Sequence, residues 1–236
     1  MAKKLYEKIR DDILDNIKNN KFKLNEMIPK ETELSLYYGV SRPTVRQAIQ
    51  LLVNEGYLDR VIGKGTFVKN NKITQDFTQI IKSYNDEMET KGLIPKTNVI
   101  SLTVTNCPEK VSNALHLQAD SKVIKLTRLR FANDYPVVYL NTYLPYDGLE
   151  FLVDMDFSKE SLYSVLESNG FKINKVTRTL NIQLSDDFSS TILNMNKNEP
   201  LFYFVSTGYH DSTPLEYSEA WYNGYVNSFR VELSIN

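Results

Sequence analysis

Two arginines stand two positions apart in a mostly apolar run of the chain, Lys122–Phe131. The run alternates as a β-strand does, so Arg128 and Arg130 fall on one face together with Ile124 and Leu126. The opposite face is not cleanly polar either, which predicts a strand covered on both sides. Buried guanidinium groups are costly unless an anion accompanies them. The pair therefore predicts a site for a phosphate or a carboxylate, because either group matches the guanidinium fork.

A serine near the start of a predicted helix could add to this anion site. Residues 159–168 are predicted to be helical, and Ser161 lies close to their N-terminal end. Free backbone N–H groups and the dipole at that end of a helix favour an anion. An alternative explanation of the two arginines is that they form ion pairs inside the protein, with Glu216 or Glu219 as the carboxylate.

A second set of polar side chains lies on a predicted helix that begins after Ser41. Ser41 is a good N-cap, and Pro43 falls in the first turn, where no backbone hydrogen bond is lost. Apolar residues at helical spacing mark its buried side: Val45, Ala48, Ile49 and Leu52. Its exposed side offers five polar residues: Arg42, Thr44, Arg46, Gln47 and Gln50. Arginine and glutamine have the two-pronged geometry that reads base edges in DNA, and threonine suits a phosphate or a thymine methyl group.

The elements around this helix complete a DNA-binding arrangement. Residues 5–18 carry apolar side chains at four-residue spacing and predict an amphipathic helix. Residues 31–38 predict a second, short helix that Gly39 ends. After the third helix, two short apolar runs flank the turn 63–65 and predict a β-hairpin. Three helices followed by a hairpin are the pattern of a winged helix-turn-helix.

The rest of the chain predicts a second domain. Residues 70–76 are interpreted as a linker, which places the first domain at 1–69 and the second at 77–236. A helical stripe begins at Phe77 and ends near Gly92. Beyond it, strands are predicted at 99–105, 122–131, 136–144, 172–184, 201–209 and 215–222, and helices at 108–115, 159–168 and 186–193. This content predicts an α+β domain with a mostly antiparallel sheet.

Composition narrows the classes of function. The chain has 236 residues and a net charge of −1, but residues 1–70 contain 13 Lys and Arg against 9 Asp and Glu. A basic first domain fits a DNA partner. Cys107 is the only cysteine, so no intrachain disulfide can form and a reducing compartment fits. Because no apolar run could span a membrane and no signal peptide begins the sequence, we expect a cytoplasmic protein with no membrane partner.

Catalytic and metal chemistry find no support in the sequence. The two histidines, His116 and His210, are far apart and have no partner at metal-ligand spacing, so no metal site is expected. The turn 63–65 is too short for a phosphate-binding P-loop, and the sequence has no nucleophile elbow or dinucleotide fingerprint. We therefore expect no catalytic residues, no cofactor and no enzyme activity.

Residues 6–68 resemble the GntR family of bacterial regulators. The resemblance rests on four segments in the family's order, namely 28–34, 38–48, 55–58 and 63–68. The remainder resembles the effector domain of the HutC-like branch, the UTRA domain, which has a chorismate-lyase-like fold. Its marks in this chain are Ser83, Arg128 and Arg130 with Asn133 and Asp134, and the segments 143–145, 161–163 and 214–217.

The resemblance implies roles for residues of both domains. In the family the third helix enters the major groove and the wing touches the backbone or minor groove, which implies DNA contacts for Arg42, Thr44, Arg46, Gln47, Lys64 and Gly65. A set that holds a phosphate is implied for Ser83, Arg128, Arg130, Ser161 and Tyr163. Glu216 matches a position that contacts the polar part of the ligand. Leu140 stands where binders of amino-sugar phosphates often carry a carboxylate, so the chain departs from that subgroup.

These expectations combine into one interpretation of the function. We expect a sequence-specific DNA-binding regulator, a repressor that acts as a homodimer on an inverted-repeat operator. A small anionic metabolite such as a sugar phosphate would control its affinity for DNA. The resemblance to a lyase fold leaves a chorismate-lyase-like enzyme as one alternative, although fold does not imply function. A DNA-binding regulator that responds to no ligand is the other alternative.

Overall fold

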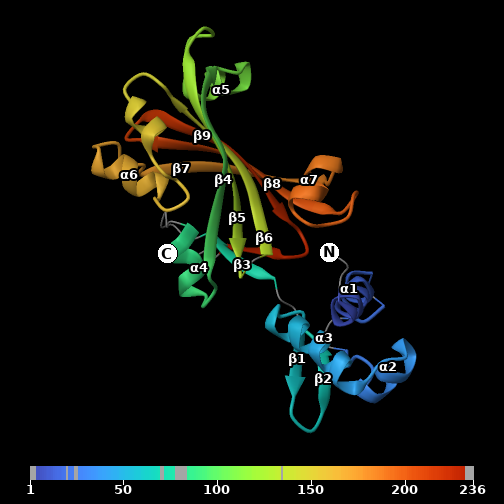
Figure 1. Ribbon diagram of the computed structural model, residues 1–236. Helices are drawn as coiled ribbons and strands as arrows, with labels where there is room; N and C mark the ends of the chain where they lie inside the picture. The colour runs from blue at the N-terminus through green and yellow to red at the C-terminus, as the bar shows by residue number, and fades with distance from the viewer. Residues whose placement is uncertain are drawn as a thin grey trace, which may run out of the picture. The chain divides into compact units, whose positions relative to one another are not determined.

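The computed structural model describes residues 4–19, 21–23, 26–69, 72–77, 84–133 and 135–231 of the chain. The chain divides into two compact units, Met1–Lys72 and Ile73–Asn236, each with its own hydrophobic core (Figure 1). None of the described helices is long and apolar enough to cross a membrane.

The first unit has three helices followed by a two-stranded hairpin, as the sequence predicts (Figure 1). The helices are α1 (Leu5–Lys18), α2 (Glu31–Tyr38) and α3 (Arg42–Asn54), and the hairpin strands are β1 (Leu58–Val61) and β2 (Gly65–Val68). All five elements contribute to one core, in which Ile13, Val45, Ala48 and Leu52 have no exposed surface. Each large side chain buried there contributes about 1.5–3 kcal/mol. This packing uses the inner face of α3 and leaves its outer face to solvent.

Local sequence signals set the ends of α2 and α3. Gly39 follows α2 with a φ of 62°, which glycine adopts without the steric cost of a Cβ atom. Ser41 is the N-cap residue of α3, as predicted, but its hydroxyl group meets the Thr44 hydroxyl group at 2.8 Å instead of capping a backbone N–H. Pro43 lies in the first turn, where its missing N–H costs no hydrogen bond.

The position of the hairpin depends on Gly65. Val61 pairs with Gly65, so residues 62–64 form the turn. Gly65 has a φ of 144°, and a Cβ atom there would lie 2.5 Å from Sδ of Met27. Met27 in turn forms a β-bridge with Phe67. Glycine suits this position because its φ is one that other residues rarely adopt, and a Cβ atom would also force the Met27 side chain to shift.

The second unit is built on one six-stranded antiparallel sheet with the strand order β4-β5-β6-β9-β8-β7. The strands are β4 (Pro95–Asn106), β5 (Lys122–Ala132), β6 (Tyr135–Pro145), β7 (Lys175–Leu184), β8 (Pro200–His210) and β9 (Thr213–Asn223). Neighbours in the sheet are also neighbours in the chain, except that β6 pairs with β9. The predicted α+β fold with a mostly antiparallel sheet is confirmed.

Short helices cover both faces of this sheet (Figure 1). They are α4 (Tyr84–Thr90), α5 (Glu109–Leu115), the 3-10 helix η1 (Glu150–Asp154), α6 (Leu162–Ser168) and α7 (Asp187–Ile192). α6 packs against Ile124 and Leu126, and α4 packs on the same face of the sheet, against Leu140 of β6. On the opposite face α5 contacts Val123, and Phe188 of α7 packs against the ring of Tyr139. β5 is thus covered on both sides, as its sequence predicts.

A small parallel sheet differs from the sequence prediction. The sequence analysis interprets 70–76 as a linker and predicts a helix from Phe77, whereas Ile73–Phe77 forms strand β3 and the helix α4 begins at Tyr84. β3 pairs in parallel with β10 (Asn227–Val231), a strand that the sequence analysis does not predict. The hydrogen-bonded residues of the two strands are about 150 positions apart, so no local pattern reveals the pairing.

Asn227 is the polar centre of this pairing and has no exposed surface. Its Nδ2 donates to the backbone oxygens of Val137 at 3.2 Å and Asn223 at 2.9 Å, and its Oδ1 accepts from Nε2 of Gln75 at 3.1 Å. The opposite orientation of the Gln75 amide would donate to Glu87 at 2.9 Å but would turn its oxygen toward Oδ1 of Asn227. Because two backbone oxygens hold the Asn227 amide in place, we favour the orientation in which Gln75 donates to Asn227.

We predict that Asn227→Ala destabilises the second unit. The substitution leaves buried polar groups without a partner, at about 1–3 kcal/mol for each group. Trp221 is the only tryptophan and lies on β9, so urea unfolding followed by its fluorescence measures this unit alone. The control Ser228→Ala removes an exposed hydrogen bond to Thr74 and should change the free energy of unfolding by less than about 0.5 kcal/mol. Equal stability of the two variants would contradict the prediction.

Candidate functional site

A pocket opens on the face of the sheet that α4 and α6 cover. It has a volume of about 160 Å³ and is lined by residues of β5, β6, β9, β8 and β7 and of both helices. Its polar lining consists of Tyr84, Glu87, Arg128, Arg130, Ser161, Tyr163, Arg178, Ser206, Glu216, Ser218 and Tyr222. Drug-sized ligands occupy pockets of about 300–1,000 Å³. This smaller space suits a small metabolite with several polar groups.

Five of the six predicted effector residues line this one pocket, namely Arg128, Arg130, Ser161, Tyr163 and Glu216. The sixth, Ser83, lies outside the described residues. Strand alternation places both arginines of β5 on one face, as predicted. The structure shows that α4 and α6 cover this face and that Glu216 reaches it from β9. Ser161 is the N-cap residue of α6, which begins at Leu162 and not at the predicted residue 159. These five residues therefore come from three parts of the chain that are distant in the sequence, namely β5, the start of α6 and β9.

The two arginines are buried, and neither forms an ion pair with any residue that the structure describes. Arg128 is 3% exposed, and one terminal nitrogen donates to Oγ1 of Thr142 at 3.2 Å. The guanidinium carbon of Arg130 lies 4.9 Å from the ring centre of Tyr84. The Nε atoms of both arginines are buried and have no hydrogen-bond partner in the described part of the chain. Burial lowers the pKa of both groups, and the charge of Arg130 lowers the pKa of Arg128 further, so a bound anion would stabilise both charges.

The nearby carboxylates are engaged by other groups. Oε2 of Glu216 accepts a hydrogen bond from the Tyr163 hydroxyl group at 2.5 Å. Burial raises the pKa of Tyr163 well above its usual value, and Glu216 adds to this effect, so the hydroxyl group remains a donor. Glu219 lies on the opposite face, where it accepts from Nζ of Lys110 at 2.7 Å and from the Tyr203 hydroxyl group at 2.6 Å. Among the described residues, neither carboxylate forms a direct ion pair with the two arginines, although the charge of Glu216 raises the pKa of both.

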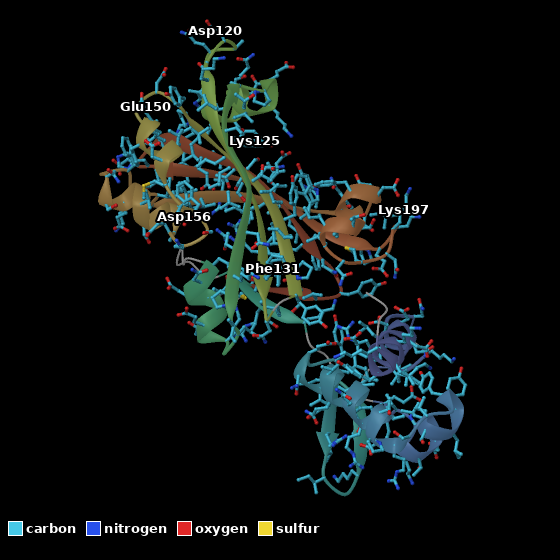
Figure 2. All side chains as sticks on the ribbon, in the orientation of Figure 1. Asp120, Lys125, Phe131, Glu150, Asp156 and Lys197 are labelled. Atoms are coloured by element: carbon cyan, nitrogen blue, oxygen red, sulfur yellow. The ribbon has the colours of Figure 1, made fainter. Side chains whose placement is uncertain are left out.

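A smaller hollow of about 20 Å³ adjoins the pocket and shares Tyr84, Arg128, Arg130 and Ser161 with it. Residues 157–161 close its other side, in the loop that follows Asp156 (Figure 2). Its volume is about that of one water-sized probe. The two spaces meet at the guanidinium groups, so an anionic group placed there would contact both arginines and the hydroxyl group of Ser161.

Arg178 of β7 lines the pocket although the sequence analysis does not single it out. Its Nε donates to Oγ of Ser206 at 3.0 Å, and its guanidinium carbon lies 5.8 Å from the ring centre of Phe204. The alternation of β7 could have placed Arg178 on one sheet face. Which face that is depends on the pairing of β7 with β8, which the sequence does not reveal.

The candidate DNA-reading residues lie on the outer face of α3 and on the wing. Three of them are exposed on α3, namely Arg42, Arg46 and Gln47. Thr44 is half-buried and bonds to the Ser41 hydroxyl group. Lys64 is exposed in the hairpin turn beside Gly65. All six predicted residues therefore belong to the first unit, four on α3 and two on the wing.

An ion-pair network joins α2, α3 and the wing at this surface. Glu31 accepts hydrogen bonds from Nε of Arg46 at 3.0 Å and from its terminal nitrogen at 2.9 Å. The same carboxylate accepts from a terminal nitrogen of Arg60 at 2.7 Å. The hydrogen bond from Arg46 is the largest cause of a lowered pKa of Glu31, so the carboxylate is charged at neutral pH. The sequence analysis does not single out Arg60. In β1 only Leu58 is buried, so Arg60 is one of the three exposed residues of this wing strand.

Comparison with known families agrees with both halves of this description. Residues 5–68 match the family described as bacterial regulatory proteins, gntR family. Residues 90–225 match the UTRA domain. The first match covers the three helices and the wing, and the second covers the sheet that carries the pocket.

Curated relatives are named as transcription regulators. The chain is 30% identical over 222 residues to the HTH-type transcriptional repressor NagR of Bacillus subtilis (strain 168), an alignment that covers 93% of this chain and 90% of the relative. It is 25% identical over 222 residues to the mannosyl-D-glycerate transport/metabolism system repressor MngR of Escherichia coli (strain K12). That alignment covers 94% of this chain and 92% of the relative.

A solved structure, PhnF from Mycobacterium smegmatis, has the same fold. Its TM-score is 0.69 at 23% identity, and the match covers 97% of this chain and 100% of PhnF. At this identity the likeness concerns the fold alone. The two family matches and the NagR relationship show more: the chain belongs to the GntR family of bacterial regulatory proteins, and it is a DNA-binding transcription regulator with a UTRA domain, not an enzyme.

Proposed function

We propose that this protein is a repressor whose affinity for operator DNA is controlled by a small anionic effector, such as a sugar phosphate, bound in the pocket of the second unit. The observation that carries the proposal is the pair of buried Nε atoms of Arg128 and Arg130, which have no hydrogen-bond partner among the residues that the structure describes. Leaving a buried donor unsatisfied costs about 1–3 kcal/mol, and more on a charged group. A phosphate group supplies both the missing acceptors and the opposite charge.

In the proposed complex the phosphate lies between the two arginines, where the pocket and the smaller hollow meet. The hydroxyl group of Ser161 is a further donor to it, and the resemblance adds Ser83. Tyr163 and Glu216 are joined by a hydrogen bond and face the remainder of the effector.

The names of two relatives support the sign of regulation and the class of effector. NagR is named a transcriptional repressor, and MngR is named the repressor of a mannosyl-D-glycerate transport and metabolism system. Repression fits both names, and a sugar-derived metabolite as the effector fits the name of MngR. We propose that the effector shifts the protein between dimer states with different spacing of the DNA-binding units and so releases the operator.

We predict that at least one member of a panel of sugar phosphates raises the melting temperature. At a concentration 100-fold above Kd, a ligand stabilises a one-site protein by about 2.7 kcal/mol. Arg130→Gln should abolish the shift. The control Lys125→Gln should keep it, because Lys125 lies on the other face of the same strand, beside the ring of Tyr143. A wild type that responds to no phosphate but binds its operator tightly would instead support a ligand-independent regulator.

For the DNA contacts, we propose that α3 enters the major groove with Arg42 and Arg46 as base readers. Thr44 and Gln47 add contacts from the same helix, and Lys64 and Gly65 contact the DNA from the wing. Glu31 orients Arg46 before DNA arrives and holds Arg60 beside it. Arg60 is thereby placed to contact a phosphate of the DNA backbone.

We predict that Arg46→Ala lowers operator affinity by about tenfold or more, because a bidentate contact between arginine and guanine is worth about 1–3 kcal/mol. Fluorescence anisotropy with an operator selected by the wild type from random duplexes measures the effect. Lys8→Ala is the control, since Lys8 is an exposed basic residue of α1. An affinity of Arg46→Ala within about twofold of the wild type would exclude α3 as the reading helix.

We propose that the protein acts as a homodimer on an inverted repeat, and that β7 carries the interface. β7 lies at one edge of the six-stranded sheet. Three apolar side chains of this strand are 45%, 73% and 64% exposed, namely Leu180, Ile182 and Leu184. A long apolar edge strand invites pairing with another chain. Two copies of β7 would pair with two-fold symmetry, which matches the symmetry of an inverted repeat.

We predict that Ile182→Lys converts the dimer to a monomer in size-exclusion chromatography with light scattering. The charge would be buried in the interface, and operator affinity should fall because one DNA-binding unit is lost. Thr179→Lys places the same charge on the other face of β7 and should leave the dimer intact. A persistent dimer in Ile182→Lys would place the interface on another surface.

Because this regulator acts on bacterial DNA, we propose the cytoplasm as its location.

A further inference from the structure

Glu31 is a negative charge among the arginines of the candidate DNA-binding surface. Its Oε2 accepts hydrogen bonds from Nε and Nη2 of Arg46 at 3.0 and 2.9 Å, and its Oε1 accepts from Nη2 of Arg60 at 2.7 Å. The hydrogen bond from Arg46 lowers the pKa of Glu31 most, and the charges of Arg46, Arg60 and Arg42 lower it further, whereas burial acts in the opposite direction. One carboxylate is thus shared between basic side chains of α3 and of the wing.

The fold fixes the position of Glu31 from both sides. Glu31 is the first residue of α2, where the helix dipole favours a negative charge. Before it, Ile28 is buried, and its backbone N–H donates to the backbone oxygen of Thr66 in β2 at 2.9 Å. After it, Leu34 is buried in the core of the first unit. The carboxylate is therefore held beside the two arginines by the packing of α2 and its link to the wing.

The bonds to Glu31 leave one end of the Arg46 guanidinium group to solvent. They engage Nε and Nη2, whereas Nη1 forms no hydrogen bond with any residue that the structure describes. The Arg46 side chain is 54% exposed, and the Glu31 side chain is 18% exposed. Nη1 and the second N–H of Nη2 can therefore face DNA while the carboxylate remains on the other edge of the same group.

The two kinds of partner that DNA offers to this end of Arg46 differ in charge. Guanine presents two acceptors on a neutral base, whereas a backbone phosphate carries a full negative charge. The nearby carboxylate of Glu31 repels a phosphate but not a neutral base edge. Binding to a random sequence relies on phosphates, and only the operator adds the correct base edges. Glu31 therefore opposes the wrong partner more than the right one.

We propose that Glu31 determines how strongly this regulator prefers its operator to other DNA: it weakens the contacts of Arg46 and Arg60 with phosphates of any duplex, and it aims Arg46 at a base edge. The inference rests on the proposed function, in which α3 reads the major groove. Glu31 itself contacts no base and acts through the two arginines, so it is a positioning residue.

The substitution Glu31→Gln tests this inference, because glutamine keeps the size of the side chain and removes its charge. Fluorescence anisotropy measures the affinity for two duplexes of equal length, namely the operator selected by the wild type and a shuffled sequence of the same composition. An exposed ion pair is worth up to about fivefold in an equilibrium constant. We expect the affinity for the shuffled duplex to rise by at least about threefold and the affinity for the operator to rise less or to fall.

The salt dependence of binding is a second measurement. The logarithm of the affinity falls with the logarithm of the salt concentration, with a slope of about −0.9 for each phosphate that is neutralised. Glu31→Gln should steepen this slope on the shuffled duplex by about 0.9 or more, because the released arginines turn to phosphates. Local unfolding would instead lower the affinity for both duplexes.

Glu33→Gln is the matched control. Glu33 also lies in the first turn of α2, and its Oε2 accepts a hydrogen bond from the backbone N–H of Lys30 at 2.9 Å, which glutamine can retain. The substitution removes the same charge from the same turn, but the carboxylate that Arg46 and Arg60 bind is that of Glu31. We expect Glu33→Gln to leave the ratio of the two affinities unchanged.

The possible results separate this inference from the function on which it rests. A wild-type ratio of operator affinity to shuffled affinity in Glu31→Gln would overturn the inference and leave α3 as the reading helix. An equal loss of preference in Glu33→Gln would also overturn it, because the charge alone would then suffice. If Arg46→Ala kept the operator affinity of the wild type, the proposed reading helix would fail and the inference with it.

Discussion

The burial of two like charges on one strand is the constraint on which the second unit depends. Arg128 and Arg130 lie on β5, which helices cover on both faces, so water cannot solvate them as it does at a surface. Among the residues that the structure describes, their direct partners are the Thr142 hydroxyl group and the ring of Tyr84, and the charge of Glu216 offsets theirs in part. Because the arginines belong to the main sheet, an anion that offsets their charges stabilises the whole unit. In the proposed function, binding of an effector and stability of the fold are therefore linked through the same two side chains.

In the first unit the arrangement is the opposite, because its arginines are exposed and paired with a carboxylate. Arg46 and Arg60 are at the surface, and Glu31 already satisfies them. In the proposed complex, DNA competes with the two partly exposed ion pairs of Glu31, which cost little to break in water. Glu31 holds the side chains of Arg46 and Arg60 in place, and in the proposed complex this costs little affinity for DNA. Buried arginines whose charge the protein offsets only in part therefore suit the capture of a small anion, and exposed arginines held by a carboxylate suit a polyanion that must be released again.

Much of this arrangement could be predicted from the sequence because it follows from the regular spacing of apolar residues within single strands and helices. The alternation of β5 predicts that Arg128 and Arg130 share a face, and the helical spacing around Arg46 predicts its exposure. The remaining features depend on pairings between distant segments. Arg178 reaches the pocket only because β7 pairs with β8, and β3 becomes a strand only because β10 lies beside it. The polar composition of residues 70–76 is that of a linker, and only the pairing partner of the segment shows that part of it is a strand.

The pairing of β3 with β10 has a consequence for the synthesis of the protein on the ribosome. The first unit can fold as soon as its hairpin has emerged, since domains generally fold as units with the N-terminal one first. In the second unit, Gln75 has to wait for Asn227, which is made 152 residues later. A nascent chain thus carries a finished DNA-binding unit well before its effector unit can close. Chains that stop short of β10 would keep the DNA-binding unit but would lack the buried amide pair that joins the start of the effector unit to its end.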